Sequence, residues 1–365
     1  MPDGRGVKSM ISRADLLAYW WAPAHAAAPG WAVFLKPLAA AYRLLIGLQR
    51  AVHRADKPDT PPGRAPVPTV VVGNWVVGGA GKTPTTLALV QHLQGAGWRP
   101  GVVSRGYGRR DRSVRLVDAT RDRAEEVGDE PLLMARTARI PVAVGRDRKA
   151  ARDRLLAAHP EVNIVIADDG LQHHRLYRDL SVVVVDERGA GNGQCLPAGP
   201  LREPIPAALG ERMVLVYSGG RQTLPLPGFL AQRQLRPPQR LGDWAAALPL
   251  APEAAWSAMG AHPVQAAAGI AVPERFFDLL RRQGVDLEAT HALPDHDAWT
   301  QTPWPPETRD VIVTEKDAVK LAPRWGQGPD QSIDAHTRIW VAGLDLVIPP
   351  ECLAQVDAML GPPPT

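Results

Sequence analysis

Cysteine is scarce in this 365-residue chain, and its scarcity excludes two classes of protein. The two cysteines, Cys195 and Cys352, cannot build the disulfide framework of a small secreted domain. Neither stands in a C-x-x-C pair or near a histidine at the spacing of a zinc site. A reducing compartment that faces the cytosol is therefore the expected location.

A strong net charge is also missing. The 42 Lys and Arg residues exceed the 38 Asp and Glu residues by only four, which fits an anionic ligand or an anionic membrane surface about as well as nucleic acid. The chain has no internal repeat at solenoid spacing and no long low-complexity tract. Its length suits two domains, each large enough to bury its own core, so a two-domain enzyme is the first expectation.

An uninterrupted apolar run is the third feature that the sequence lacks. The stretch WAVFLKPLAAAYRLLIGLQRAVHR is broken by Lys36, Pro37 and Arg43, whereas a spanning helix needs about 20 mostly apolar residues. It also begins late for a signal peptide, and no clear small-residue cleavage site follows it. Two interpretations stay open: a segment lying in the membrane interface, with Trp at headgroup depth, or a helical hairpin packed on the body of the protein.

Short β-branched runs alternate with helical stretches in the middle of the chain. The expected strands are PTVVVG, PGVVS, IPVAVG, VNIVIAD and SVVVVD, and the expected helices span 84–95, 129–139 and 148–159. Strands separated by helices predict a parallel sheet covered on both faces, with ligands at the carboxyl ends of the strands.

Composition divides the chain into three parts. Residues 1–55 hold the apolar helices, and a connector rich in proline leads from them into a nucleotide-binding core over residues 56–222. Residues 223–365 form a smaller α/β unit, whose expected elements are the strands HPVQAAAGI, DVIVTEKD and RIWVAGLDLVI and the helix PERFFDLLRRQG.

The stretch VVVGNWVVGGAGKTPTTLALV reads as a strand, a turn of small residues and a helix start. The expected nucleotide-binding residues are Gly78, Gly79, Ala80, Gly81, Lys82, Thr83 and Pro84. Lys82 would neutralise the β and γ phosphates and the Thr83 hydroxyl would bind Mg²⁺, while Pro84 is tolerated in the first helical turn. The alternative is a plain glycine-rich turn, and Val76 stands where the common phosphate-loop motif has glycine.

An apolar strand ends in the acidic pair Asp168 and Asp169. Carboxylate oxygens beside a phosphate loop are what a Mg²⁺-nucleotide site requires, although such a pair can equally cap a turn. His173 and His174 follow closely, but adjacent side chains point in different directions, and no cysteine is spaced for zinc. We therefore interpret the two histidines as lying outside the metal site.

Two further motifs allow either a structural or a chemical role. In GDEPLLMA, Asp129 and Glu130 begin a helix, where the dipole favours acidic residues, and the alternative is a base for an acceptor hydroxyl. In LPDHDAW, His296 stands between carboxylates, either in a surface loop or as the partner of such a base. The arginines that could contact phosphates, or form a solvated face, are Arg105, Arg109, Arg110 and Arg202.

Taken in order, these motifs resemble those of one family, the tetraacyldisaccharide 4'-kinases, or lipid A 4'-kinases. The matching motifs are VVGNWVVGGAGKTP, SRGYGRR, GDEP, DDGLQHHRLYRD, GNGQCLPAGPLREP, GIAVPERFF, PDHDAW and VTEKDAVKL, and the resemblance extends to about residue 345. The family's loop also lacks the first glycine, so Val76 is no departure. Ala271 and Val272, where the family more often has Gly-Asn, and Ala190, where an aromatic is common, affect only local loop shape.

The resemblance implies a P-loop NTPase-like fold and a reaction that uses ATP and Mg²⁺. The γ-phosphoryl group would pass to the 4'-hydroxyl of a tetraacylated glucosamine disaccharide 1-phosphate, forming lipid IVA. The implied catalytic residues are Asp129, His296 and Lys82; the Mg²⁺ residues are Thr83, Asp168, Asp169 and Glu130; and the substrate contacts are Arg105, Arg202, Glu203 and Asn74. Because the base and its partner lie on different units, closure of the C-terminal unit would complete the site and exclude water.

The implied partners are the lipid A disaccharide precursor and the cytoplasmic leaflet of the Gram-negative inner membrane. A four-chain lipid does not leave the bilayer readily, which favours the interfacial interpretation of the N-terminal helices. We expect a monomer that binds no nucleic acid. Two other functions stay open: a membrane-associated P-loop ATPase switch, which would hydrolyse ATP without a sugar acceptor, and a soluble small-molecule kinase with an inert N-terminus.

Overall fold

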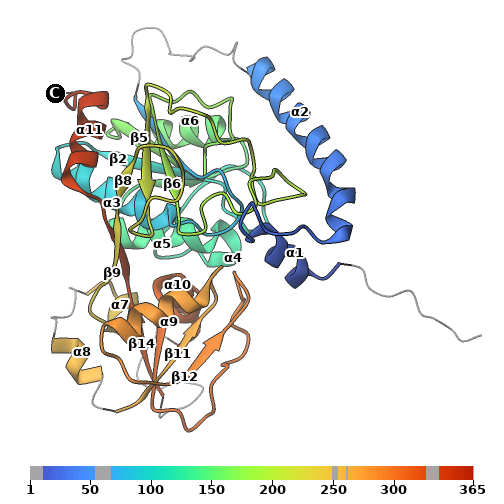
Figure 1. Cartoon of the computed structure of the whole chain (residues 1–365). Helices are drawn as coiled ribbons and strands as arrows, with labels where there is room; N and C mark the ends of the chain where they lie inside the picture. The colour runs from blue at the N-terminus through green and yellow to red at the C-terminus, as the bar shows by residue number, and fades with distance from the viewer. Residues whose placement is uncertain (1–10, 54–66, 249–253, 260–261, 326–336, 365) are drawn as a thin grey trace, which may run out of the picture.

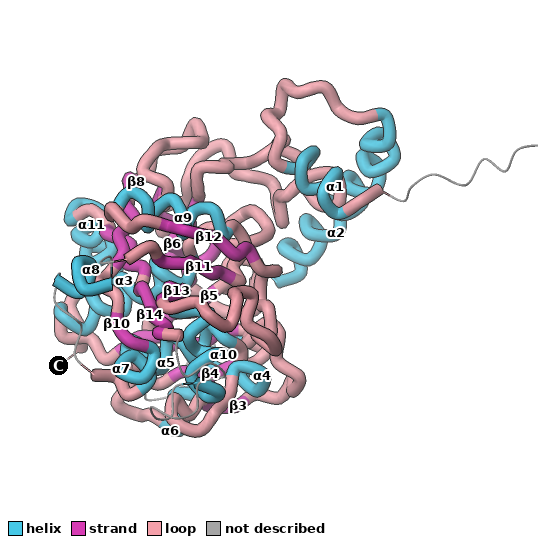
Figure 2. Tube along the Cα trace, turned by 90° about the horizontal axis from the view of Figure 1, so that it is seen from below, coloured by secondary structure: helices cyan, strands magenta, loops and turns pink. Residues whose placement is uncertain are grey.

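The chain folds around two mostly parallel β-sheets (Figures 1 and 2). The structure is a computed structural model that describes residues 11–53, 67–248, 254–259, 262–325 and 337–364. The first sheet has the order β3-β4-β2-β5-β1-β6-β7-β8, and its strands are parallel except for β3, which runs antiparallel to β4. Its strands are β1 (Thr69–Gly73), β2 (Pro100–Ser104), β3 (Arg115–Leu116), β4 (Val142–Val144), β5 (Ile164–Asp168), β6 (Leu180–Val185), β7 (Met213–Tyr217) and β8 (Phe229–Leu230).

Helices cover both faces of this first sheet. They are α3 (Lys82–Gly95), α4 (Ala124–Val127), α5 (Asp129–Ala138) and α6 (Arg148–Ala158). Leu89 of α3 and Met134 of α5 share one core with Ile166, whereas Leu155 of α6 packs into the core on the opposite face. The predicted parallel sheet with helices on both faces is confirmed, because the β-branched runs are buried on both sides.

The second sheet has the order β10-β14-β13-β11-β12. Its strands are β10 (Gln239–Arg240), β11 (Val264–Ala268), β12 (Leu287–Ala292), β13 (Asp310–Thr314) and β14 (Arg338–Ala342), with helices α7 (Leu241–Ala245), α8 (Ala254–Met259), α9 (Pro273–Arg282) and α10 (Glu315–Trp325). Strand β12 was not expected from the sequence. Its side chains alternate between half-buried and exposed, as in an edge strand, and the strand has little apolar character.

The stretch RIWVAGLDLVI contains two strands rather than the one that the sequence predicts. Strand β14 ends at Ala342, and β15 (Leu344–Val347) pairs antiparallel with β9 (Gln232–Leu235) in a separate two-stranded ribbon. The break falls at Gly343, where a Cβ atom would come within 2.4 Å of the Arg236 guanidinium. Beyond β15, α11 (Pro350–Leu360) returns to the core of the first sheet, so the chain passes twice between the sheets.

The N-terminal helices lie along one side of the first sheet. They are α1 (Arg13–Trp20), the 3₁₀ helix η1 (Gly30–Phe34) and α2 (Leu35–His53), and α2 stands out from the rest of the molecule in Figure 1. By length and composition only, Gly30–Val52 could cross a membrane, so the interruptions noted in the sequence do not exclude a span. Its large exposed apolar residues are Val33, Phe34, Leu38, Leu44, Leu45, Leu48 and Val52.

Candidate active site

The loop between β1 and α3 has the conformation of a phosphate cradle. Gly78 and Gly81 adopt φ values of 87° and 90°, which a residue with a side chain rarely takes, so the small residues are required by the backbone. The Lys82 ammonium folds back over the loop, 3.4 Å from Asn74 Oδ1 and 3.5 Å from the Gly78 carbonyl. Pro84 lies in the first turn of α3, as the sequence predicts.

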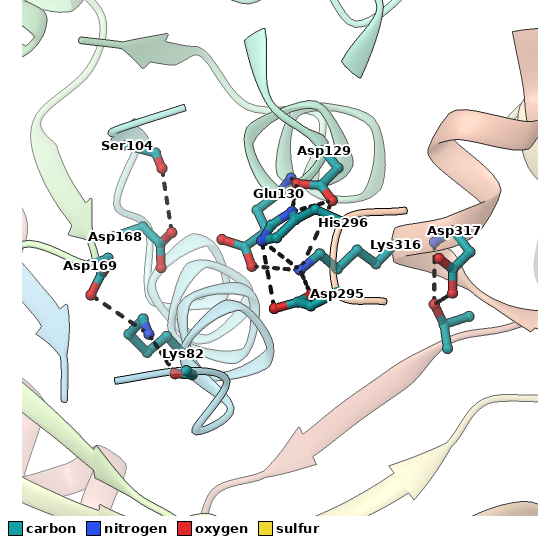
Figure 3. A network of polar contacts seen from close by, with 12 residues as sticks. Lys82, Ser104, Asp129, Glu130, Asp168, Asp169, Asp295, His296, Lys316 and Asp317 are labelled. Atoms are coloured by element: carbon teal, nitrogen blue, oxygen red, sulfur yellow. Dashed lines mark hydrogen bonds and ion pairs between the residues drawn. The ribbon is translucent and has the colours of Figure 1, made fainter. Parts of the chain in front are cut away.

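Asp168 lies at the carboxyl end of β5 and is almost fully buried, with 1% of its surface exposed. Its carboxylate accepts hydrogen bonds from the Thr86 hydroxyl at 3.1 Å and the Ser104 hydroxyl at 3.5 Å, as Figure 3 shows for Ser104. Burial, together with the charges of Glu130 and Asp169, raises the pKa of Asp168 to about 7. The site thus holds more negative charge than its protein partners neutralise.

Asp169 takes a left-handed backbone conformation with φ 49° and faces two cations. Its Oδ1 atom lies 3.6 Å from Lys82 Nζ and 2.6 Å from the Arg202 guanidinium. Burial opposes ionisation, but Lys82 and Arg202 outweigh it and lower the pKa of Asp169 to about 2. Asp169 is therefore an anion that orients Lys82 beside the loop.

These residues fit a magnesium ion that is held partly by phosphate oxygens. Among the described residues, no group of three or more His, Cys, Asp and Glu side chains is arranged to hold a metal ion. Mg²⁺ in nucleotide sites needs only one or two carboxylates and takes its other oxygens from phosphates and water. The buried, under-neutralised Asp168 carboxylate and the Thr83 hydroxyl at the helix start suit that ligand set.

Asp129 and His296 meet although 167 positions separate them in the chain. Asp129 begins α5 and is 5% exposed, and His296 Nδ1 lies 2.9 Å and 3.1 Å from its two carboxylate oxygens. Burial disfavours the carboxylate, but the hydrogen bond from His296 and the charges of Lys316, His296 and Lys320 lower the pKa of Asp129 to about 2. The acid is ionised throughout the neutral range, and Figure 3 shows its contact with His296.

Lys316 of α10, the helix that follows β13 of the second sheet, contacts this site and was not predicted from the sequence. Its ammonium lies 3.1 Å from Asp295 Oδ1, 3.2 Å from Glu130 Oε1 and 3.4 Å from His296 Nε2. An ammonium only donates, so in neutral His296 the Nε2 atom accepts from Lys316 and the Nδ1–H donates to Asp129. Protonated His296 donates to Asp129 from the same Nδ1–H. The motif VTEKDAVKL places Lys316 and Lys320 one helical turn apart, on one side of a helix. The sequence does not show which residues that side of α10 faces.

Lys320, one turn after Lys316, adds a second cation to the same group. Its ammonium lies 3.6 Å from Asp129 Oδ2 and donates to the Asp297 carbonyl at 2.9 Å. The Tyr107 ring lies 4.9 Å from the His296 ring, centroid to centroid. The histidine is thus held from both units, by α10 and by the loop after β2.

Arg202 and Glu203 connect the cradle to the N-terminal helix α2. Gln172 accepts from the Arg202 guanidinium at 3.2 Å and donates to Glu203 Oε1 at 3.0 Å. From α2, the Tyr42 hydroxyl donates to the Arg202 carbonyl at 3.0 Å, and Arg50 forms an ion pair with Glu203. The predicted pair at the mouth of the site is therefore braced by the apolar helix.

Other expected site residues are placed less centrally. Arg105 follows β2 with an exposed side chain, and the Glu130 carboxylate is bound to Lys316. His173 accepts a hydrogen bond from the Arg148 backbone N–H at 3.1 Å. Burial and the charge of Arg148 lower the pKa of His173 to about 4, so it is neutral and acts as a structural acceptor.

Comparison with known proteins identifies similar chains of one kind. A family model described as Tetraacyldisaccharide-1-P 4'-kinase matches residues 31–361. A tetraacyldisaccharide 4'-kinase from Leptothrix cholodnii is 50% identical over 337 residues, covering 90% of this chain and 92% of that one. The corresponding protein from Methylibium petroleiphilum is 48% identical over 340 residues, covering 91% and 90%.

One solved structure has a similar fold. It is described as the "apo" form of LpxK from Aquifex aeolicus in complex with ATP, and it superposes with a TM-score of 0.70 at 23% sequence identity. The match covers 90% of this chain and 98% of the other. At that identity the likeness establishes the fold, which is the predicted P-loop type of α/β architecture.

Proposed function

The chain belongs to the tetraacyldisaccharide-1-P 4'-kinase family, and from this membership we propose how its residues divide the work of the reaction. The protein is a tetraacyldisaccharide 4'-kinase of lipid A biosynthesis. It transfers the γ-phosphoryl group of ATP to the 4'-hydroxyl of tetraacyldisaccharide 1-phosphate. Phosphoryl transfer depends mainly on in-line positioning and on neutralisation of phosphate charge.

The observation that carries the assignment of the base is the contact between Asp129 and His296 across the two sheets. Asp129 accepts the proton of the 4'-hydroxyl, and His296 holds the carboxylate in place through its Nδ1–H. With a pKa near 2 the carboxylate is a weak base. It suffices because the attacking oxygen becomes strongly acidic once its bond to phosphorus has begun to form, as a loose transition state allows.

The phosphate side of the reaction is assigned to the loop and the acidic pair. The backbone N–H groups of residues 78–83 face the phosphates, and Lys82 neutralises the β and γ groups. A bound Mg²⁺ would supply neutralisation of the phosphate charge. Asp168 and Thr83 would hold it, and Asp169 keeps Lys82 directed at the loop.

The acceptor side is assigned to the mouth of the site. Arg202 would contact the anionic sugar lipid, with Asn74, Glu203 and Arg105 as further contacts. Arg202 suits this role because it lies beside Asp169 yet is only partly buried, and a guanidinium recognises phosphate with two parallel hydrogen bonds.

The apolar helix α2 would rest in the cytoplasmic leaflet of the inner membrane. Its outer side exposes large apolar residues, whereas its inner side is tied to Arg202 and Glu203. A monomer bound in this way meets its lipid at the membrane surface. We propose three functional parts, residues 1–55, 56–222 and 223–365, with β15 and α11 of the last part packed back on the core.

A labelled-phosphate transfer assay tests this function. The purified protein, γ-labelled ATP and Mg²⁺ are incubated with tetraacyldisaccharide 1-phosphate in mixed micelles, and the products are separated into lipid and inorganic phosphate. We expect label in the lipid, at the 4' position. Release of inorganic phosphate at the same rate with and without acceptor would instead support an ATPase.

A further inference from the structure

Two arginines outside the site described above meet at one carbonyl of the phosphate loop. Arg188, after β6, donates to the Gly79 carbonyl at 2.8 Å, and Arg275, on α9, reaches the same oxygen at 3.4 Å. Both also bind the buried Asp186 carboxylate, at 2.6 Å and 2.9 Å. Arg275 comes from the second sheet's layer, so this carbonyl joins the two units of the enzyme.

The planar peptide between Gly79 and Ala80 links the direction of the Gly79 carbonyl to that of the Ala80 N–H. In a trans peptide the C=O of one residue and the N–H of the next point in opposite directions. With the Gly79 carbonyl held outward by two guanidinium groups, the Ala80 N–H is directed the other way. The next carbonyl, of Ala80, accepts from the Ser218 hydroxyl at 2.9 Å, which directs the Gly81 N–H away from Ser218.

The position of Arg188 also depends on the N-terminal segment. Its guanidinium stacks on the Trp21 ring, with Cζ 4.0 Å from the ring centroid. The neighbouring Trp20 is tied to the same loop, because its ring N–H donates to the Pro197 carbonyl at 3.0 Å and its carbonyl accepts from the Asn192 N–H at 2.8 Å. The contacts of Trp20 and Trp21 thus help to position Arg188, which binds the Gly79 carbonyl of the phosphate loop.

We propose that Arg188 and Arg275 are positioning residues that hold the Gly79–Ala80 peptide so that the loop's N–H groups face the ATP phosphates. The Trp21 ring supports Arg188 in this position beside Asp186, which links nucleotide affinity to the N-terminal segment. The packing at this point is close, since a Cβ atom on Gly79 would lie 3.2 Å from Ala271 Cβ. This inference rests on the proposed binding of ATP by the loop.

The affinity of the full-length protein for Mg²⁺-ATP, measured by calorimetry without lipid acceptor, tests the proposal. We expect Arg188→Ala and Arg275→Ala each to raise the dissociation constant about tenfold or more, because each removes a charge-assisted hydrogen bond to the loop. Arg188→Lys keeps the charge but not the forked, stacked geometry, so it should recover only part of the affinity. Trp21→Ala should weaken binding, and Trp21→Phe, which keeps an aromatic face, should weaken it less.

Two controls separate the outcomes. Arg221, whose guanidinium donates to the Glu187 carbonyl at 3.0 Å, is the matched arginine, and Arg221→Ala should leave ATP affinity unchanged. Lys82→Ala tests whether the loop binds ATP at all.

If Lys82→Ala weakens ATP binding while both arginine variants bind ATP normally, the positioning role of the arginines is overturned. If Lys82→Ala also binds ATP normally, the proposed function of the loop fails instead. Thermal unfolding of each variant checks folding, and an unchanged KM for the lipid separates positioning of the loop from general damage.

Discussion

Asp129 is buried at a helix start, and its environment keeps it charged. Asp129→Asn preserves shape and the contact with His296 but removes the proton acceptor. We expect turnover to fall by about 10²–10⁴-fold, the range of general base contributions. ATP affinity should change little, since phosphate binding is assigned to the loop before α3. Single-turnover transfer of label and ATP calorimetry measure the two effects. Near-normal turnover would mean that another group takes the proton.

Asp168 makes stability depend on pH in the nucleotide-free protein. Its pKa is about 7 when folded and about 3.9 in an unfolded chain. Between these values the folded state keeps a proton that the unfolded state has lost, so Asp168 lowers stability as pH rises from about 4 to 7.

The variant Asp168→Asn should remove this dependence. Denaturant unfolding at pH 5 and pH 8 should show a gain over the wild type that is larger at pH 8, on the order of 1 kcal/mol or more. Mg²⁺-ATP should raise the stability of the wild type at pH 8 by more than that of the variant. A gain that is equal at both pH values would show that Asp168 is already ionised in the acidic protein.

The sequence predicts a role for several site residues one at a time, and the family resemblance implied the pairing of Asp129 with His296, which the structure shows. The other partners could not be predicted. Lys82 and Asp168 stand in local motifs whose residue types state their chemistry. His296 and Lys316 reach Asp129 from positions more than 160 residues away, and local patterns carry no information about such contacts. Arg188 and Arg275 were missed for the same reason, because an arginine after a strand or on a helix is ordinary until the loop beside it is seen.

The helix α2 has two unlike sides, one tied to the mouth of the site and the other apolar and exposed. Leu44 and Leu48, one turn apart, are 66% and 55% exposed. We expect the double variant Leu44→Gln, Leu48→Gln to reduce co-sedimentation with vesicles of anionic phospholipid about tenfold or more, because two leucines would no longer bury their apolar surface in lipid.

The comparison residue for this helix experiment is Leu230 of β8, which is 48% exposed on the first sheet's edge. Leu230→Gln should leave vesicle binding unchanged, and neither variant should alter ATP affinity. Equal vesicle binding by the α2 variant and the wild type would place the membrane contact elsewhere.

The overall architecture followed from periodicity because the strands of the first sheet are continuous β-branched runs and the helices between them are long. The route of the chain between the two sheets could not be predicted from periodicity. The division of RIWVAGLDLVI at Gly343 depends on the Arg236 side chain that occupies the space, and the return of α11 depends on apolar residues such as Val356 that match a distant core. Whole-molecule connectivity is set by such non-local packing.

Assembly of the two units places one ammonium among three carboxylates. Lys316 of α10 lies within 4 Å of Glu130 and Asp129 on α5 and of Asp295 beside His296. Lys316→Met would leave these charges facing one another across a partly buried contact, which opposes closure. We expect turnover to fall about tenfold or more with ATP affinity unchanged, and Lys316→Arg to retain part of the activity.

Glu130 allows a stricter test of the effect of charge at Lys316. If Lys316 acts by neutralising the facing carboxylates, then Glu130→Gln, added to Lys316→Met, removes one of the repelling charges and should restore turnover severalfold relative to Lys316→Met alone. If Lys316 acted only through packing, the two losses would add. The double-mutant cycle, measured from kcat for transfer to the lipid, therefore decides whether electrostatic attraction between the two units brings Asp129 and His296 together.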